Sequence, residues 1–141
     1  MQQYRNIYQL ARESAGDTQE KSAEILGISV ESLRAYECDK RIPPDKAVIK
    51  MIEIYDTQYL AYQHLKKADL GEYIPEISLV NLPSAILKLL NSVNCFLKRK
   101  DELIEISADG VIDESEVLSY KEILKDLDDI TNAVMTLKFV K

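Results

Sequence analysis

A single glycine between two short helical patterns, within residues 18–44, constrains the fold of this chain most strongly. Thr18 can cap the first helix, because its hydroxyl can accept a hydrogen bond from a free backbone N–H of the first turn. Gly27 can end that helix in the left-handed conformation, which glycine adopts at little steric cost. Ser29 can cap a second helix directly afterwards. The sequence therefore predicts two short helices joined by a tight turn.

The apolar residues of these two helices indicate how they pack. Ala23 and Leu26 lie on the inner face of the first helix. Leu33 and Tyr36, three residues apart, turn the second helix inward, and Ile28 can fill the gap between the helices. Two short helices that cross at a steep angle, the second with a polar outer face, are typical of a helix-turn-helix, whose second helix lies in the major groove of DNA. The outer face of this recognition helix is predicted to carry Val30, Glu31, Arg34 and Ala35.

The region from about Tyr4 to Tyr62 contains four segments with a recognisable order: YRNIYQLARESAG, TQEKSAEILGIS, SVESLRAYE and RIPP. Together they resemble the Cro/repressor-type helix-turn-helix family, which is also called the xenobiotic-response-element family. The resemblance implies a DNA-binding transcriptional regulator, and the expected role is that of a prophage-like repressor.

The resemblance also implies which residues contact DNA. In this family the glutamine beside the helix cap, here Gln19, commonly contacts phosphate, and the first residues of the third helix read bases. The late position that is often glutamine or asparagine is Ala35 here, and Val30 stands at an early reading position. Few side chains are left to read bases through hydrogen bonds, so the alternative is a protein-interaction adaptor or antirepressor that keeps the helix-turn-helix as a scaffold. The predicted DNA-binding residues are Gln19, Ser29, Val30, Glu31, Arg34, Ala35, Lys40 and Arg41.

The net charge of −6 is unfavourable for DNA binding, since lysine and arginine contacts to phosphate supply most of the non-specific affinity. Residues 1–75 carry 10 basic and 12 acidic side chains, and residues 76–141 carry 8 and 12. Arg34, Lys40 and Arg41 fall near the end of the recognition helix, where they can form a basic rim against one DNA strand. The alternative is a set of scattered, solvated cations. Because this electrostatic attraction is weak, a dimer is a better binder than a monomer.

The composition is that of a globular protein, with 46% hydrophobic and 30% charged residues. The N-terminal segment MQQYRNIYQL has no apolar run after Arg5, so no signal peptide and no membrane span are predicted and the cytoplasm is the expected compartment. Cys38 and Cys95 are far apart and are expected to be reduced thiols, with Cys38 small and buried. Because the chain has no glycine-rich phosphate loop and no nucleophile motif, neither an enzyme nor a cofactor is expected.

The region after RIPP completes an N-terminal helix-turn-helix domain that is predicted to span residues 1–70. Pro44 and Asp45 suit the first turn of a fourth helix. A fifth helix is expected from about Gln58 to Lys67, which makes a five-helix repressor-like domain. The glycine and the two prolines of residues 71–83 cannot continue a helix, so this segment is predicted to be a linker.

Two long helical patterns follow, and residues 84–141 are predicted to form an antiparallel helical hairpin, which makes the chain all-α. The first helix is expected from about Ser84 to Ile106 and the second from about Glu114 to Leu137. The first helix has two apolar lines, more than one partner helix can cover. We therefore expect a homodimer in which two hairpins cover each other; the alternative is that the surplus surface packs within one chain. The two lines are Ile86, Leu90, Val93, Leu97 and Ile104, and Leu82, Leu89, Phe96 and Leu103.

The loop of the hairpin, Glu105–Glu116, matches part of the calcium-binding EF-hand pattern. The first ligand of that pattern is normally aspartate, and Glu105 would have to retract one methylene. The same letters also fit a helix end and a new helix start, because Gly110 can turn the chain, Asp113 can cap the next helix and Glu116 can close a capping box. This second interpretation predicts no specific metal site. The candidate calcium ligands are Glu105, Ser107, Asp109, Asp113 and Glu116.

Overall fold

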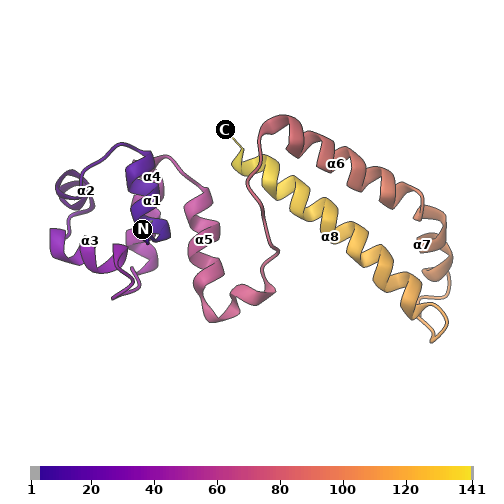
Figure 1. Cartoon of the computed structure of the whole chain (residues 1–141). Coiled ribbons are helices and arrows are strands. Elements are labelled where there is room, and N and C mark those ends of the chain that lie inside the picture. Colours follow the sequence, from indigo (N-terminus) through magenta and orange to yellow (C-terminus); the bar gives the residue numbers. More distant parts are fainter. Residues whose placement is uncertain (1–3, 141) are drawn as a thin grey trace. The chain divides into compact units, whose positions relative to one another are not determined.

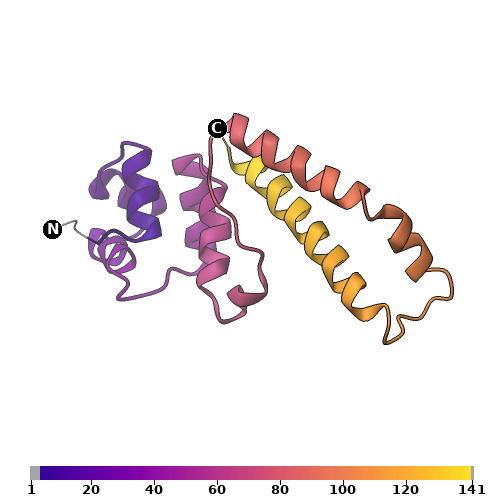
Figure 2. The same ribbon diagram turned by 45° about the vertical axis from the view of Figure 1, so that its right-hand side comes forward.

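The computed structural model describes residues 4–140, and within this range the chain contains helices and no strand. The predicted all-α fold is confirmed. The chain divides into two compact units, Met1–Ile74 and Pro75–Lys141, and each unit packs its own helices together (Figures 1 and 2). No helix within residues 4–140 is both long and apolar enough to cross a membrane.

The described part of the N-terminal unit contains five α-helices and a short 3₁₀-helix. Thr18 Oγ1 accepts a hydrogen bond from the backbone N–H of Lys21 at 3.2 Å, and Ser29 Oγ accepts one from Ser32 at 3.1 Å. Gly27 lies in the left-handed region with a φ of 69°. The two predicted caps and the predicted turn are therefore confirmed. The elements are α1 (Ile7–Ser14), α2 (Gln19–Leu26), α3 (Val30–Glu37), α4 (Asp45–Tyr55), α5 (Tyr59–Lys67) and η1 (Asp69–Tyr73).

The core of this unit lies between the inward faces of these five α-helices. Ile28 packs partly against the core, as predicted. Val30 also packs against it, which differs from the prediction that Val30 lies on the outer face. The reason is its register: Val30 and the buried Glu37 are seven residues apart, about two turns, and therefore share one side of α3. The buried apolar residues are Tyr8, Ala23, Leu26, Leu33, Tyr36, Val48, Met51, Tyr55 and Leu60.

A buried ion pair connects α1 with α3. Arg12 Nε donates to Glu37 Oε1 at 2.6 Å and Arg12 Nη2 donates to Glu37 Oε2 at 3.0 Å, so the guanidinium binds both carboxylate oxygens. Only 9% of the Arg12 side chain and 1% of the Glu37 side chain are exposed. Arg12 Nη1 also donates to the carbonyl of Asp17 at 2.7 Å, directly before α2. The pair therefore fixes α1, the start of α2 and the end of α3 relative to one another.

The first part of the predicted linker belongs to the N-terminal unit instead. η1 follows α5 closely, and the ammonium of Lys66 donates to the carbonyls of Gly71 at 3.0 Å and Ile74 at 2.7 Å. A Cβ at Gly71 would lie 2.0 Å from the carbonyl oxygen of Lys66, so only glycine fits here. The last part of the predicted linker is also ordered, because Asn81 caps α6 and Pro83 lies in its first turn.

The C-terminal unit is a helical hairpin made of α6 (Leu82–Leu97), α7 (Lys100–Ile106) and α8 (Val117–Phe139), with α6 packed against α8. The prediction of one continuous first helix is wrong, because the helix breaks at Lys98 and Arg99. Arg99 has a φ of −108° and a ψ of 4°, outside the helical region. Its guanidinium reaches across to α8, where Nη1 lies 2.6 Å from Glu122 Oε2 and Nε lies 3.4 Å from Asp126 Oδ2.

The hairpin loop has the predicted capping box. Asp113 Oδ1 accepts hydrogen bonds from the backbone N–H groups of Ser115 at 2.7 Å and Glu116 at 3.2 Å, and Glu116 Oε2 accepts one from Asp113 at 3.1 Å. The bonds from Ser115 lower the pKa of Asp113. Glu105 lies inside α7, so the helix continues past the first position of the calcium pattern. Within residues 4–140, no group of three or more His, Cys, Asp or Glu side chains is arranged to hold a metal ion.

The buried ion pair generates a prediction about stability. Glu37→Gln keeps the size of the side chain but leaves the Arg12 guanidinium buried without a counter-charge, so we expect the free energy of unfolding to fall by about 3 kcal/mol. Urea unfolding followed by tyrosine fluorescence measures this, since nearly all tyrosines lie in the N-terminal unit. Glu31→Gln, an exposed change in the same helix, should cost less than about 0.5 kcal/mol. Equal losses for the two variants would contradict the role given to the ion pair.

The capping box generates a second prediction. Asp113 and Glu116 are already hydrogen-bonded to each other in the turn that leads into α8. Calcium should therefore leave the melting temperature of the protein unchanged apart from the effect of ionic strength, which magnesium at the same concentration controls for. A ligand that binds only the folded state must raise the melting temperature by mass action. A saturable calcium site tighter than roughly 10⁻⁴ M, a weak value for such loops, would contradict the capping interpretation.

Candidate nucleic-acid interface

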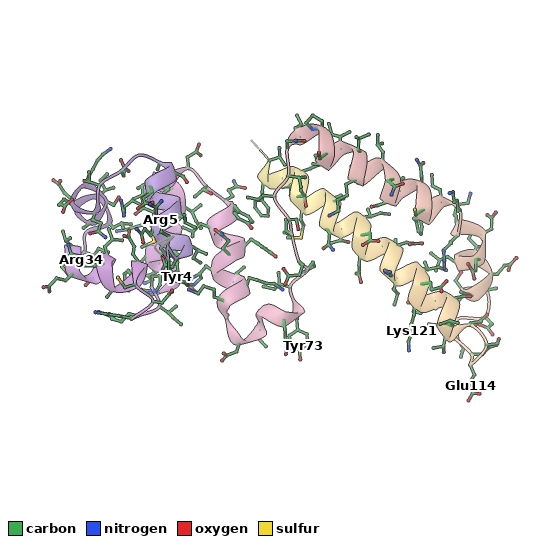
Figure 3. The ribbon with its side chains drawn as sticks, in the orientation of Figure 1. Tyr4, Arg5, Arg34, Tyr73, Glu114 and Lys121 are labelled. Carbon is green, nitrogen blue, oxygen red and sulfur yellow. The ribbon has the colours of Figure 1, made fainter. Side chains whose placement is uncertain are left out.

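The outward face of α3 is set by what its inward face buries. Leu33, Tyr36 and Glu37 are buried, so the opposite side of the helix faces solvent. Glu31 and Arg34 are exposed there, and Ala35 is half-buried between them and the core. Arg34 lies on α3, where Figure 3 labels it, and its guanidinium reaches toward Gln19 of α2. The structure therefore brings together three of the four residues predicted for the outer face, and Val30 is the exception.

The chain turns sharply after α3 and keeps two cations beside the end of the helix. Asp39 adopts a φ of 56°, and the backbone N–H groups of Lys40 and Arg41 both donate to the carbonyl of Ala35, at 3.0 and 3.2 Å. The guanidinium of Arg41 lies 5.6 Å from the ring centre of Tyr36, which orients it by a cation–π contact. Arg34, Lys40 and Arg41, all exposed, are the basic rim of the site.

The carboxylate of Asp39, within this turn, is neutralised from the inner side. Lys67 Nζ lies 2.6 Å from Asp39 Oδ1, and the hydroxyl of Tyr4 and the amide of Asn6 donate to the same carboxylate at 2.9 and 3.1 Å. The contact with Lys67 contributes most to lowering the pKa of Asp39, and the bonds from Asn6 and Tyr4 lower it further. Because Lys67 balances this charge, Asp39 weakens the basic rim less than an unpaired carboxylate would.

Gln19 and Ser29 are predicted to contact DNA, and in the structure both side chains form hydrogen bonds within the N-terminal unit. Gln19 Nε2 donates to Glu37 Oε2 at 2.7 Å, so its amide is bound to the buried ion pair, and Gln19 Oε1 lies 3.5 Å from Arg34 Nη2. Ser29 Oγ caps α3 and donates to Ser32 Oγ at 2.9 Å. Both side chains thus support α3 in this structure, and the contact of Gln19 with phosphate and the DNA contact of Ser29 stay predictions.

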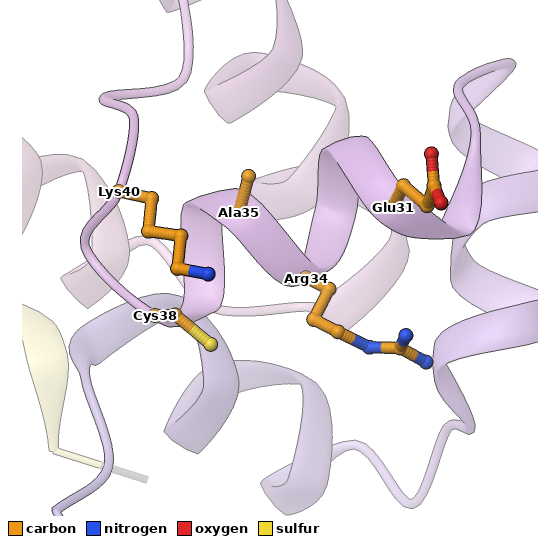
Figure 4. A pocket seen from close by; sticks show the side chains of 5 residues that line it. All are labelled: Glu31, Arg34, Ala35, Cys38 and Lys40. Atoms are coloured by element: carbon orange, nitrogen blue, oxygen red, sulfur yellow. The ribbon is translucent and has the colours of Figure 1, made fainter.

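A shallow hollow of about 250 Å³ opens to solvent along the outward face of α3 and the turn after it (Figure 4). Cys38 is exposed here, which corrects the expectation of a buried thiol, and both cysteines are free. No pattern in the sequence places Cys38 at the surface, since a small apolar side chain at the end of a short helix fits either environment. The residues that line the hollow are Glu31, Arg34, Ala35, Cys38 and Lys40.

Comparisons with known proteins identify the family of this chain. Residues 9–60 match a protein-family model described as helix-turn-helix. The HTH-type transcriptional regulator ImmR of Bacillus subtilis (strain 168) is 33% identical to this chain over 118 residues, which cover 82% of this chain and 84% of ImmR. No solved structure gives a significant match.

The matched region contains the whole of α2 and α3 with the caps and the turn described above, and the similarity to ImmR extends over most of both chains. This chain therefore belongs to the family of helix-turn-helix transcriptional regulators, which bind DNA.

Proposed function

We propose that this protein binds a specific sequence of double-stranded DNA through α3, and that it acts in the cytoplasm as a dimer that represses transcription by covering a promoter. The observation that carries the proposal is the outward face of α3, where Glu31 is exposed next to the basic rim of Arg34, Lys40 and Arg41 on a helix fixed by the buried ion pair. The name of ImmR, a transcriptional regulator, supports the same kind of role.

The side chains of the site divide into two roles. Arg34 can donate two hydrogen bonds to a guanine, and Glu31 can accept one from a cytosine, so these residues are suited to read bases in the major groove. Lys40 and Arg41 lie beyond the end of α3 and are suited to bind the phosphates beside that groove. Gln19 lies between Arg34 and Glu37 and can hold the guanidinium of Arg34 in place.

A single module of this kind is a weak binder. The N-terminal region has a slight excess of acidic over basic side chains, and only Arg34, Lys40 and Arg41 form the rim. Since each phosphate contact adds to affinity, a small number of cations gives a low affinity. Two modules held together would bind two half-sites, and the second contact becomes intramolecular. The proposal therefore needs a dimerisation surface, and the hairpin offers one.

Each of the two long hairpin helices carries two rows of residues with alternating spacings of three and four. The first row faces the other helix: Ala85 on α6 and Ile123 and Ala133 on α8 are fully buried. The second row is shifted from the first by one residue, so each of its residues is the next one in the sequence after a first-row residue. The first rows are Ala85, Leu89, Ser92 and Phe96 on α6, and Ile123, Asp126, Ile130 and Ala133 on α8. The second rows are Ile86, Leu90, Val93 and Leu97, and Leu124, Leu127, Thr131 and Val134.

The two second rows lie on the same side of the hairpin. An α-helix turns by about 100° per residue, so the second row is rotated by that angle from the first on both helices. α6 and α8 run antiparallel (Figures 1 and 2), and a two-fold axis perpendicular to their common plane relates two such helices. Rotation about that axis exchanges the two helices but does not exchange the two faces of the hairpin. Since the second row is rotated by the same angle from the first row on each helix, both second rows lie on the same face. We name the two second rows together the outer apolar face.

The outer apolar face is partly exposed within the hairpin, although it carries seven apolar side chains and one threonine. Ile86, Leu90 and Leu97 on α6 and Leu124 and Val134 on α8 are all exposed. A patch of this kind is uncommon on a soluble monomer. A second copy of this chain is the partner that fits the outer apolar face. Two such faces packed against each other form a four-helix bundle, in which each hairpin covers the apolar face of the other.

The DNA-binding proposal predicts the effect of removing two cations. Arg34→Ala combined with Arg41→Ala should weaken binding to a DNA fragment from the protein's own promoter, and the lost phosphate contact of Arg41 should flatten the salt dependence by about one unit. Lys121→Ala combined with Lys125→Ala removes the same charge from exposed positions of α8 (Lys121 is labelled in Figure 3) and should leave binding nearly unchanged. Gel-shift titrations at several salt concentrations measure both variants.

Two outcomes would contradict the proposal. If the wild-type protein shifted no fragment of its promoter at low salt, the alternative of a protein-interaction adaptor or an antirepressor would take its place. If the two double variants lost the same affinity, general charge rather than α3 would account for the binding.

The dimer proposal predicts the effect of one charge in the outer apolar face. The full chain should sediment as a dimer at tens of micromolar, and Leu90→Asp should raise the dissociation constant at least about a hundredfold, since each dimer loses two buried leucines worth about 1.5–3 kcal/mol each. Leu118→Asp is the control, because Leu118 is also an exposed leucine, with an exposed fraction of 71% against 54% for Leu90. Leu118 lies about a third of a turn from the second row of α8 and is therefore outside the outer apolar face. A wild-type monomer, or equal dissociation of both folded variants, would refute the proposal.

A further inference from the structure

The hollow beside α3 has a chemistry that selects one kind of base edge. We infer that it accepts the 5-methyl group of a thymine, so that each half-site contains one thymine recognised by contact with Ala35 and Cys38. The inference rests on the proposed function and names part of the sequence that α3 reads. It adds Cys38 to the residues that determine specificity.

Two of the five residues that line the hollow, Ala35 and Cys38, have small uncharged side chains, and we call these two residues its floor. Ala35 and Cys38 are three residues apart, about one turn of α3, so they are neighbours on its outward face (Figure 4). A methyl group and a thiol offer at most a weak hydrogen bond. The carbonyl of Ala35 is already bound by the N–H groups of Lys40 and Arg41. The floor therefore has little to offer a polar group but can contact an apolar one.

The charged residues around the floor determine which side of the hollow faces the bases and which side faces the phosphates. Glu31 and Arg34 line it along the helix, and Lys40, from the turn after the helix, extends its side chain back beside the end of α3 (Figure 4). A carboxylate such as Glu31 repels phosphate, whereas Lys40 attracts it. When α3 lies in the major groove, the side with Glu31 therefore points toward the bases and the side with Lys40 toward the backbone. This orientation brings a base edge, and not a phosphate, over Ala35 and Cys38.

Thymine is the base that fits this floor. In the major groove, guanine, adenine and the amino group of cytosine present polar atoms, and thymine alone adds a methyl group. A polar base atom placed over the floor would lose its water without gaining a partner. The hollow of about 250 Å³ is wider than a methyl group and leaves room for the edge of the base that carries it. An alanine side chain in the major groove also recognises thymine by apolar contact with its methyl group.

The test replaces thymines by deoxyuridines, which pair in the same way and lack only the 5-methyl group. The full chain first selects its preferred site from random double-stranded DNA, and each thymine of that site is then replaced singly. We expect one position in each half-site where the replacement lowers affinity about fourfold, the effect of one buried methyl group. At that position the loss should disappear in Cys38→Ser, which replaces the thiol by a more strongly hydrated hydroxyl, and should persist in Cys95→Ser, the matched change in the hairpin.

The outcomes separate this inference from the proposed function. If the protein selects a specific site but no single deoxyuridine weakens binding, or if the sensitive position is unchanged in Cys38→Ser, the thymine contact is refuted while sequence-specific binding stands. Ala35→Ser provides a second check at the other side of the floor, and the same position should lose its sensitivity there. If the wild-type protein selects no site at all, the proposed function and this inference fall together.

Discussion

The buried ion pair between Arg12 and Glu37 is the interaction on which the N-terminal unit depends. Three hydrogen bonds from one guanidinium connect α1, the turn before α2 and the end of α3, and Gln19 donates a further hydrogen bond to Glu37. Removing two charges from water costs several kcal/mol, so the pair is stable only because these bonds are all made. The same bonds hold α3 at a fixed angle, and a fixed helix can present its outward side chains to DNA without further ordering.

The two units contribute to DNA affinity in different ways. The N-terminal unit has three cations in its basic rim and a slight excess of acidic residues, so its attraction to DNA is small. The hairpin has an apolar face that its own two helices leave partly exposed. If that face joins two chains, affinity comes from two sites bound together instead of from a high charge at one site. Under this arrangement, the specificity of each site can rest on a few side chains such as Arg34 and Ala35.

Local chemistry explains which features could be predicted from the sequence. The caps at Thr18 and Ser29, the left-handed Gly27 and the capping box of Asp113 and Glu116 each depend on residues within one turn of helix, and all of them are present. Other features depend on distant partners and were missed. Arg99 interrupts the first hairpin helix while paired with Glu122 and Asp126 on α8, although the apolar pattern continues across the break. Val30 packs inward because the buried side of α3 includes Glu37.

The sequence by itself determined the all-α class, the five helices of the N-terminal unit and the helix-turn-helix among them, since periodicity and capping are properties of short segments. It also named most residues of the site, because exposure on a helix follows from which neighbours are apolar. Only the tertiary structure decided that Gln19 binds Glu37, that Cys38 is exposed beside Ala35, and that α6 and α8 present their second rows on one face. The physical reason is that these features depend on how separate helices are oriented toward each other, and periodicity within one helix does not contain that orientation.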